Sequence, residues 1–243
     1  MQSEIFNIQN LTQFEKYALK IFDYQMENNT IYAAYAALIL KGNTPINIFE
    51  IPFLPISFFK TEQIICQRRR IEEIFLSSGT TGDKSKHLVS DISIYRESYL
   101  KTFELFYGDI SQYCILSLLP NYRQQEGSSL IYMIDDMIVK SKNKDSGSYF
   151  DSYEKLSIKL AQLEKENQKI ILFGVSYALL DLAELFPQKL KNTIIIETGG
   201  TKGNRGQIVK EELHKKLKAA FSLNNIHSEY GMSELLSQSY SSG

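Results

Sequence analysis

The chain has 243 residues, of which 43% are hydrophobic and 23% charged, enough apolar material for the core of one large or two small domains. Its 27 Lys and Arg residues against 28 Asp and Glu residues give a net charge of −1, so we expect no nucleic-acid surface. The longest apolar run, residues 31–40, is too short to span a bilayer, and the polar start lacks a signal pattern. We therefore expect a cytoplasmic protein without a transmembrane segment. Two cysteines and three scattered histidines predict neither a disulfide framework nor a structural zinc site.

The first part of the chain has the pattern of helices. Apolar residues recur at intervals of three and four between Leu11 and Ile21, and a capping box at Thr12 and Glu15 would open this helix. A second helix is expected at residues 31–40, ending at Gly42.

Three prolines between residues 43 and 60 predict an extended segment. We therefore divide the chain into an N-terminal helical and extended segment, residues 1–60, and an α/β core, residues 61–243. Beyond the extended segment, strand and helix patterns alternate, with a polar loop at residues 140–148 that we expect to be the most mobile segment. Strands are expected at residues 74–77, 114–119, 170–175, 193–196 and 225–228, and helices at residues 92–106, 128–139, 153–166, 177–185 and 207–220.

Two of the expected strands, around residues 170–173 and 194–196, are apolar on both faces. Strands buried between two helical layers have this pattern, whereas a half-exposed antiparallel strand alternates. The sequence therefore predicts an α/β fold with a mostly parallel sheet flanked by helices and an N-terminal helical extension.

Hydroxyls, glycines and lysines follow the first expected strand. In open α/β sheets, the loops at the carboxyl ends of strands hold ligands, and glycine lets backbone N–H groups approach an anion. The loop differs from a Walker A motif because two residues, not four, separate its glycines. A simple Gly/Ser/Thr turn is an equally open interpretation. The candidate phosphate ligands are Ser77, Ser78, Gly79, Thr80, Thr81, Gly82 and Lys84, with Lys86 behind them.

Two further stretches with localised glycines follow expected strands. Residues 197–206 do not contain the Gly-x-Gly-x-x-Gly dinucleotide fingerprint, but Gly199, Gly200 and Thr201 stand where a nucleotide could bind. In residues 227–234, a tyrosine before a glycine could lie against a base, and a Ser-Glu pair could supply a hydroxyl and a Mg²⁺ ligand. A core tyrosine in a tight turn with a solvated glutamate is the other interpretation of this stretch.

Two stretches of the sequence, taken together and in this order, resemble two motifs of the adenylate-forming superfamily. The stretches are Ser-Ser-Gly-Thr-Thr-Gly before Lys84 and the later Tyr-Gly-Met-Ser-Glu. The motifs are the superfamily's phosphate loop and its Tyr-Gly-x-Thr-Glu motif. Within that superfamily, the sequence is most similar to the acyl-protein synthetases of bacterial bioluminescence and to phenylacetate-CoA ligases. Residues 56–60, 173–177, 197–203 and 235–241 support the resemblance, which covers roughly residues 51–240. It departs from the superfamily at Ser85, which replaces a proline, and at Ser233, which replaces a threonine.

The resemblance implies the large-domain fold of these enzymes and ATP-dependent activation of a carboxylic acid, with a fatty or other acyl acid favoured. An acyl-adenylate would form, and the acyl group would pass to a thiol of a protein cysteine or of coenzyme A. Catalytic roles would fall to Lys84, Ser233 and Glu234, with Glu234 as the Mg²⁺ ligand. Nucleotide binding would fall to the phosphate loop and to Gly199, Gly200, Thr201, Tyr230 and Gly231.

The acid pocket is expected near Tyr122, Arg123 and Gly174, although Tyr122 is equally well explained as a surface turn residue. Cys114 opens an apolar strand, so we expect it in the core, where a thiol is inert. Cys66 precedes a run of arginines and stays open as a reactive thiol.

In the family, a ribose-binding aspartate and a lysine of a small C-terminal domain follow the Tyr-Gly-x-Thr-Glu motif. This sequence ends shortly after Glu234, so the resemblance implies that the small domain lies outside these residues. Two other functions stay open: an aryl- or acyl-CoA ligase, and a nucleotide-binding relative without catalysis. A homo-oligomer is also open, because the apolar helix at residues 31–40 could pack on the sheet or on a second copy.

Overall fold

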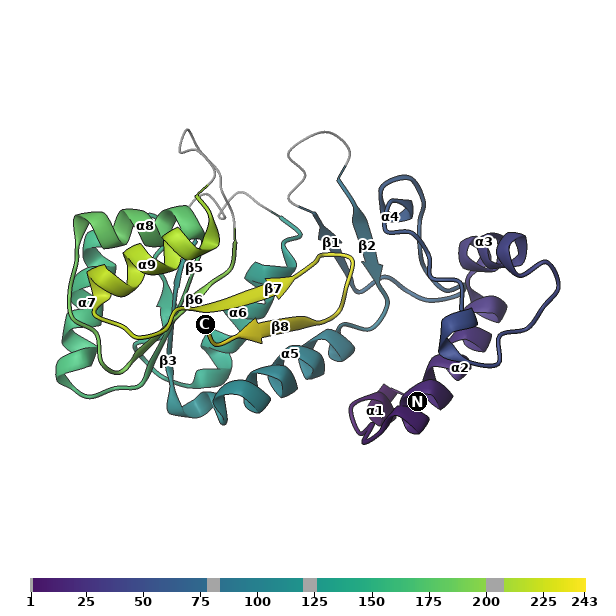
Figure 1. Cartoon of the computed structure of the whole chain (residues 1–243), viewed down its shortest axis with the longest axis horizontal. Coiled ribbons are helices and arrows are strands. Elements are labelled where there is room, and N and C mark those ends of the chain that lie inside the picture. The colour runs from purple at the N-terminus through teal and green to yellow at the C-terminus, as the bar shows by residue number, and fades with distance from the viewer. Residues whose placement is uncertain (1, 78–83, 120–125, 200–207) are drawn as a thin grey trace. The chain divides into compact units, whose positions relative to one another are not determined.

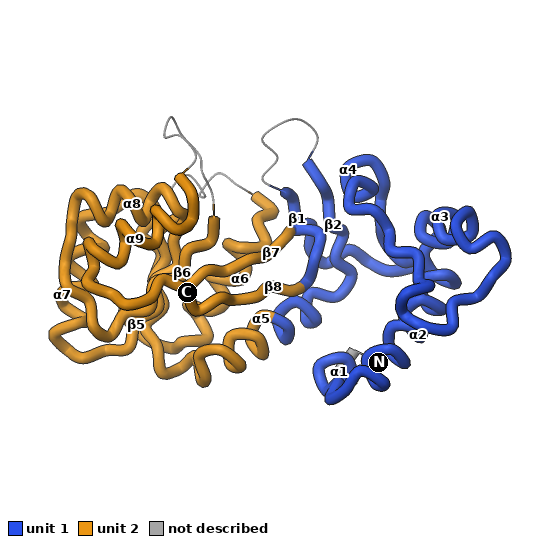
Figure 2. Tube along the Cα trace, viewed as in Figure 1, with its two compact units in different colours: residues 1–98, 233–236 blue, residues 99–232, 237–243 orange. Residues whose placement is uncertain are grey.

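The computed structural model describes residues 2–77, 84–119, 126–199 and 208–243 (Figure 1). The contacts divide the chain into two compact units (Figure 2). Unit 1 contains residues 1–98 and 233–236, and unit 2 contains residues 99–232 and 237–243. The boundary drawn from the sequence at residue 60 lies inside unit 1.

Unit 1 begins with helices, as the apolar spacing predicts. They are α1 (Gln2–Ile5), α2 (Leu11–Asn28) and α3 (Thr30–Leu40), followed by the 3₁₀ turn η1 (Ile48–Glu50) and the short helix α4 (Phe58–Thr61). The expected helices near residues 11–21 and 31–40 are therefore confirmed. The segment expected to be extended, residues 43–60, contains the turn η1 between its prolines, and α4 begins near its end.

The capping box expected at Thr12 and Glu15 is wrong. Asn10 caps α2 instead, because its side chain accepts a hydrogen bond from the backbone nitrogen of Gln13 at 3.0 Å. The Glu15 carboxylate accepts a hydrogen bond from the backbone nitrogen of Ile48 at 3.2 Å, so it ties η1 to α2.

The core of the N-terminal helices is small. Phe22, Tyr32, Ala36 and Ile51 are buried together. The Tyr32 hydroxyl donates to the backbone oxygen of Pro52 at 2.9 Å, which fastens the chain after η1 to α3. Proline has no N–H of its own, but its carbonyl oxygen still serves as an acceptor.

A two-stranded antiparallel sheet completes unit 1. Strand β1 (Glu73–Leu76) confirms the strand expected at residues 74–77, and it pairs with β2 (Lys86–Val89). The loop after this strand was expected at the carboxyl end of a strand in an open α/β sheet. That placement is wrong, because the loop joins two antiparallel strands of a separate sheet. Helix α5 (Ile92–Tyr107) follows and continues into unit 2.

Unit 2 is built on a six-stranded sheet with the order β4-β3-β5-β6-β7-β8. The first five strands of this order, β4 to β7, run parallel to one another. The edge strand β8 is antiparallel to its neighbour β7. Every residue of β3 and β5 is buried, as their apolar sequences predict. The strands are β3 (Cys114–Leu118), β4 (Gly147–Ser148), β5 (Ile170–Gly174), β6 (Thr193–Glu197), β7 (His227–Gly231) and β8 (Gln238–Ser241).

Helices connect the parallel strands of unit 2. The chain leaves β3 toward β4 in one direction and then passes from β4 through β5, β6 and β7 in the other. Since parallel crossovers are right-handed, α6 covers one face and α7, α8 and α9 cover the other. Figure 1 shows α8 and α9 lying side by side. The helices are α6 (Ser129–Ser141), α7 (Tyr153–Lys165), α8 (Ser176–Leu185) and α9 (Lys210–Phe221), with a 3₁₀ turn η2 (Ile110–Gln112) before β3.

The expected α/β fold with a mostly parallel, helix-flanked sheet is thus confirmed. Two details differ from the sequence-based expectation. The loop expected at residues 140–148 begins in α6 and ends in β4, where the Ser117 hydroxyl donates to the Ser148 hydroxyl at 2.9 Å. The strand expected at residues 225–228 is β7, which begins at His227 where it pairs with β6 and extends to Gly231 where it pairs with β8.

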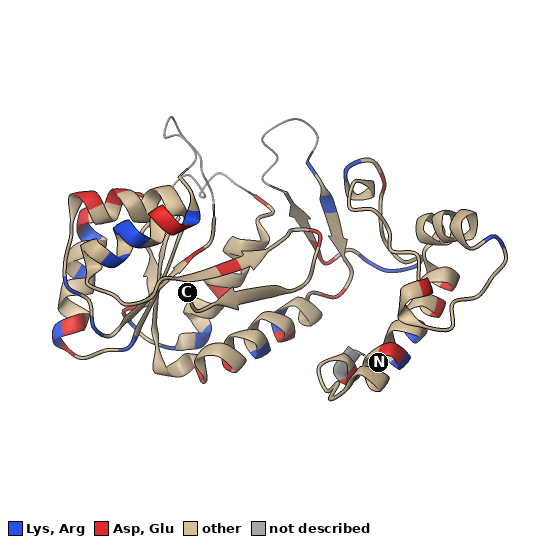
Figure 3. Cartoon of the chain, in the orientation of Figure 1, with Lys and Arg blue, Asp and Glu red and all other residues tan. Residues whose placement is uncertain are grey.

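Charges of both signs are interspersed along the helices (Figure 3). In α9, Glu211 and Glu212 lie in the first turn and Lys218 in the last, which complements the helix dipole. In the described part of the chain, no helix is long and apolar enough to cross a membrane.

Candidate functional site

The expected phosphate loop begins and ends at a closed hairpin stem in unit 1. The backbone nitrogen of Ser77 donates to the backbone oxygen of Ser85 at 3.1 Å, and the backbone nitrogen of Ser85 donates to the Ser77 hydroxyl at 2.9 Å. Ser85 is buried and Lys84 is exposed. The loop residues themselves, Ser78, Gly79, Thr80, Thr81 and Gly82, lie outside the described residues.

Ser233 lies beside this stem although it is far away in sequence. Its hydroxyl donates to the backbone oxygen of Leu76, the last residue of β1, at 3.1 Å. Its own backbone oxygen lies 3.0 Å from Nδ1 of His87 in β2. A carbonyl oxygen only accepts, so Nδ1 carries the proton in this contact. The structure therefore brings Ser233 to the base of the hairpin that carries Ser77 and Lys84.

The His87 ring is neutral in this arrangement. Burial lowers the pKa of His87, and its contact with Ser233 and the nearby charge of Glu234 only partly oppose that effect. With Nδ1 protonated, Nε2 is an acceptor. His87 follows the Ser-Ser-Gly-Thr-Thr-Gly stretch by a few residues in the sequence, and its ring is bonded to Ser233 of the second motif.

Glu234 is the carboxylate of this group that could hold a metal ion. Mg²⁺ is commonly held by one or two carboxylates together with substrate phosphates, so a single glutamate fits the ligand role expected from the sequence. Among the described residues, no group of three or more His, Cys, Asp and Glu side chains could hold a metal by itself.

A second group of predicted residues lies in unit 2, at the carboxyl ends of β5 and β6. The backbone nitrogen of Thr198 donates to the oxygen of Gly174 at 3.0 Å, and the backbone nitrogen of Ser176 donates to the oxygen of Gly199 at 3.1 Å. Gly199 has a φ of +74°, a conformation that glycine adopts without strain. The structure thus brings Gly174 and Gly199 together, while Gly200 and Thr201 lie outside the described residues.

A buried carboxylate organises this edge of the sheet. Oε1 of Glu197 accepts hydrogen bonds from the Ser176 hydroxyl and the Gly199 backbone nitrogen, each at 2.7 Å. Oε2 accepts one from the Ser228 hydroxyl at 3.2 Å. Hydrogen bonds to an ionised acceptor are stronger than neutral ones, and they offset the cost of burying the charge. Glu197 therefore joins the turn after β5, the turn after β6 and strand β7.

Two further ionisable groups lie near Glu197. Nε2 of His214, in α9, is 3.9 Å from Glu197, and burial lowers the pKa of His214. Burial and the negative charge of Glu197 raise the pKa of Glu229, in β7, to about 7. The carboxyl edge of the sheet thus combines Glu197 with a second glutamate, Glu229, that is half protonated near neutral pH.

Gly174 has a packing role in addition to its backbone contact. A Cβ atom added to Gly174 would lie 2.6 Å from Cδ2 of Leu179, a buried residue of α8. The absence of a side chain at this position therefore allows α8 to pack closely on the end of β5.

Tyr230 and Gly231 lie within a strand, not in the tight turn considered above. They belong to the second half of β7, where Tyr230 pairs with Ser239 and Gly231 with Gln238. The Tyr230 side chain is 64% exposed, so the interpretation as a core tyrosine is wrong. An exposed aromatic ring on a paired strand has a defined backbone and a free face, which suits stacking on a planar group.

The sheet reverses its direction of growth between β3 and β5. In open α/β sheets, ligands bind outside the carboxyl ends of the strands at such a switch point. Gly174 ends β5 at this point. The predicted acid-pocket residues Tyr122 and Arg123 follow β3, but they lie outside the described residues.

Both cysteines are poor nucleophiles. Cys114 is fully buried, as expected, and burial raises the pKa of its thiol to about 11. Cys66 is half-buried, and burial raises its pKa more than the nearby charge of Arg69 lowers it. The arginines would favour a Cys66 thiolate only if Cys66 were exposed, and here desolvation outweighs the charge of Arg69.

Sequence reasoning missed the residues that organise the carboxyl edge in unit 2. Glu197 stood in a quoted motif without a role, and Ser176, Ser228 and Glu229 were not singled out. A glutamate directly after an apolar strand, with serines after the neighbouring strands, is the pattern that could have identified the group. The sequence matches no protein-family model, and a search of curated proteins finds no match.

Proposed function

We propose that the chain activates a carboxylic acid by ATP-dependent formation of an acyl-adenylate and passes the acyl group to a thiol, with an acyl acid as the favoured substrate. The observation that carries this proposal is the hydrogen bond between Ser233 and Leu76. It joins the Tyr-Gly-Met-Ser-Glu stretch to the hairpin of the Ser-Ser-Gly-Thr-Thr-Gly loop. Ser233, the fourth residue of the Tyr-Gly-Met-Ser-Glu stretch, is thus bonded within unit 1 to the strand that precedes the Ser-Ser-Gly-Thr-Thr-Gly loop, which supports the proposal that both motifs serve one nucleotide.

The residues of this group have chemistry that suits a triphosphate. Backbone N–H groups and hydroxyls of the loop from Ser77 onward would bind phosphate oxygens, and Lys84 would add a positive charge. Glu234 would hold Mg²⁺, which supplies charge neutralisation at the phosphates when bound. The Ser233 hydroxyl has one proton, which it donates to Leu76, so we assign Ser233 to position Glu234.

In unit 2, Glu197 holds the turn that contains Gly199, which the resemblance assigns to the adenine pocket. The exposed Tyr230 ring could stack on a base. The raised pKa values of Cys66 and Cys114 disfavour both thiols as acyl acceptors, which supports an acceptor thiol on another molecule.

Exchange of radioactive pyrophosphate into ATP tests the proposal. The protein would be assayed with a panel of straight-chain, branched and aromatic carboxylic acids. We expect exchange with at least one acid, a loss of about 100-fold or more in Glu234→Ala and Lys84→Ala, and little change in the exposed control Lys216→Ala.

The molecule that carries the acceptor thiol distinguishes a CoA ligase from an acyl-protein synthetase. AMP release that depends on coenzyme A would identify a CoA ligase, and stable acyl transfer to a protein cysteine would identify an acyl-protein synthetase. ATP binding without exchange for any acid would contradict both enzymes and leave a nucleotide-binding protein.

A further inference from the structure

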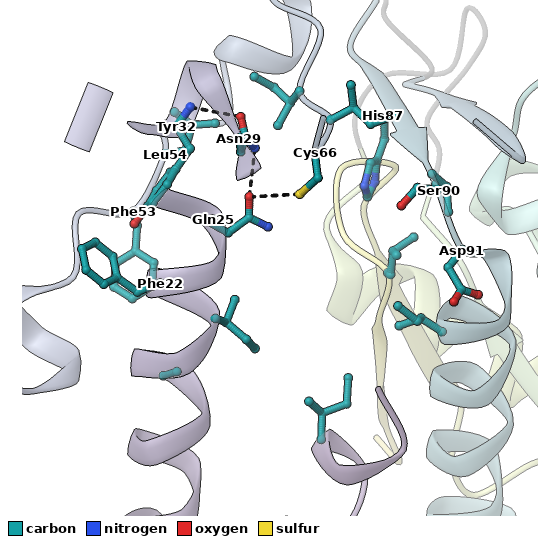
Figure 4. A pocket seen from close by; sticks show the side chains of 18 of the residues that line it. Phe22, Gln25, Asn29, Tyr32, Phe53, Leu54, Cys66, His87, Ser90 and Asp91 are labelled. Carbon is teal, nitrogen blue, oxygen red and sulfur yellow. Dashed lines mark hydrogen bonds between the residues drawn. The ribbon is translucent and has the colours of Figure 1, made fainter. Parts of the chain in front are cut away.

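Unit 1 contains a cavity of about 690 Å³ that the proposed nucleotide chemistry does not use (Figure 4). Helix α2 and residues 51–54 line one side of it, and β2 with the start of α5 lines the other. Small-molecule pockets typically have volumes of roughly 300–1,000 Å³, so the cavity is large enough for a ligand.

The body of the cavity is apolar. Ala18 and Phe22 of α2 contribute to one wall, and Leu88 and Ile94 contribute to the other. Leu236, from the segment directly after the Tyr-Gly-Met-Ser-Glu stretch, also lines it. A ligand that removes this surface from water gains affinity in proportion to the apolar area that it covers.

A small polar group lies on the wall formed by α2. Oε1 of Gln25 accepts from Nδ2 of Asn29 at 2.9 Å and from the thiol of Cys66 at 3.7 Å. Figure 4 shows the Gln25 amide nitrogen directed toward the wall that carries His87 and Ser90. This nitrogen donates no hydrogen bond to the part of the chain that the structure describes, so it is available to a ligand.

The opposite wall offers an acceptor. His87 donates through Nδ1 to Ser233, which leaves its Nε2 as an acceptor. Gln25 and His87 could therefore hold a group that both accepts and donates a hydrogen bond. A hydroxyl group has this property.

The charges on the lining disfavour an anion. The lining contains no Lys or Arg, and Asp91 adds a carboxylate. Oδ1 of Asp91 accepts from the backbone nitrogen of Ser93 at 3.0 Å, so this carboxylate already serves the start of α5. Arg69 lies near Cys66 and Asp91, but it donates to the Tyr24 hydroxyl at 3.2 Å and interacts with the Asp91 carboxylate. A carboxylate ligand would therefore enter apolar surroundings whose neighbouring cation already has partners, and that costs free energy.

We propose that this cavity binds an uncharged long-chain molecule with one hydroxyl head group, the head lying between Gln25 and His87 and the chain lying between Ala18 and Ile94. The cavity shares His87 with the Ser233 contact of the candidate site, but the proposal does not depend on acid activation. A primary alkanol is the simplest ligand of this class.

Protection of Cys66 from alkylation measures occupancy, since Cys66 lies on the cavity wall. The rate of its reaction with iodoacetamide would be followed by peptide mass spectrometry in the presence of octanol, decanol or dodecanol. Cys114 is fully buried and serves as the internal control. We expect the dissociation constant to fall about fourfold for each added methylene group until the cavity is filled. We also expect carboxylates and alkylammonium ions of equal length to bind at least tenfold more weakly.

Two variants connect binding to the cavity. Ala18→Phe should fill the apolar body and abolish protection, whereas Glu27→Ala, an exposed change on the same helix, should leave it unchanged. Gln25→Leu should weaken decanol binding about tenfold and leave decane binding unchanged. Equal binding of carboxylates, no dependence on chain length, or unchanged protection in Ala18→Phe would each overturn the proposal. The comparison of head groups uses the unaltered protein, so it stands even if a variant fails to fold.

Discussion

Glu197 is buried with three hydrogen-bond donors around its carboxylate. We expect Glu197→Ala to lower the free energy of unfolding by about 3 kcal/mol, because the Ser176, Gly199 and Ser228 donors would lose a charged acceptor. Glu197→Gln keeps the shape and most contacts, and we expect a loss of about 1 kcal/mol.

Urea unfolding of the variants measures this effect. Glu212→Ala is a matched control, because Glu212 pairs with Lys216 on the exposed side of α9 and should change stability by less than about 0.5 kcal/mol. Equal losses in Glu197→Ala and Glu212→Ala would contradict the role given to the buried carboxylate.

Glu229 should make stability depend on pH. Its folded-state pKa is about 7, above the ordinary value of 4.5, so the folded protein holds a proton that the unfolded chain releases between these pH values. The contribution to stability is complete below about pH 4.5 and is lost as pH rises through 7. Its upper limit is about 3 kcal/mol, since one pKa unit corresponds to about 1.4 kcal/mol.

Comparison with Glu229→Gln isolates this contribution. The difference in unfolding free energy between wild type and variant should shift in favour of the variant as pH rises from 5 to 8. The histidines titrate in both proteins, so their effects cancel in the difference. A difference that stays constant with pH would show that Glu229 ionises normally.

Substitution of Gly174 tests whether α8 packs closely on β5. We expect Gly174→Ala to destabilise unit 2 by about 1–3 kcal/mol, because its methyl group would overlap with the Leu179 side chain. In a double-mutant cycle measured by urea unfolding, Leu179→Ala should reduce the cost of Gly174→Ala. Additive losses would mean that Leu179 is not the group that the methyl meets.

At the scale of elements, substitutions at the start of α2 test whether Asn10 or Thr12 caps the helix. Asn10→Ala should cost about 1 kcal/mol of stability, because the Asn10 side chain accepts from the nitrogen of Gln13. Thr12→Ala should change stability by a few tenths of a kcal/mol, since Thr12 lies inside the helix and is exposed. Thermal unfolding followed by circular dichroism measures both, and a larger loss for Thr12→Ala would support the capping box instead.

Elements with strong periodicity were predictable from the sequence. The buried strands β3, β5 and β6 and the helices α5, α7 and α8 lie close to where apolar spacing predicted them. Strand β8 was not predicted, because its sequence Gln-Ser-Tyr-Ser has no marked apolar pattern and it forms only by pairing with β7. Strand β4 has two residues and depends in the same way on β3.

The candidate site was predictable as a set of motifs but not as an arrangement. Hydroxyls and glycines marked the loop after Ser77, and Ser233 was singled out by its motif. That Ser233 reaches Leu76 depends on long-range folding, which local patterns do not encode. The Glu197 hydrogen bonds likewise connect serines from different strands, so no local spacing could reveal them.

At the scale of the whole molecule, the two units differ in how their backbone is protected. Strands β3 and β5 are buried and have partners on both sides, whereas β1 and β2 form a two-stranded sheet. We expect amide hydrogens of β3 and β5 to exchange at least 100-fold more slowly than those of β1 and β2, because small sheets open at lower free energy. Hydrogen exchange followed by mass spectrometry measures both. Equal rates would indicate that the chain opens only as one cooperative unit.

The Glu197 carboxylate also has a consequence for how unit 2 folds. Glu197 of β6 is directly opposite Ser228 of β7 in the sheet register. A slip of one residue would turn the Ser228 side chain to the other face and leave the buried charge with fewer donors. A misaligned β6–β7 pair would therefore carry an electrostatic penalty that the correct pair does not. Glu197 thereby favours a single alignment of two strands that α9 separates along the chain.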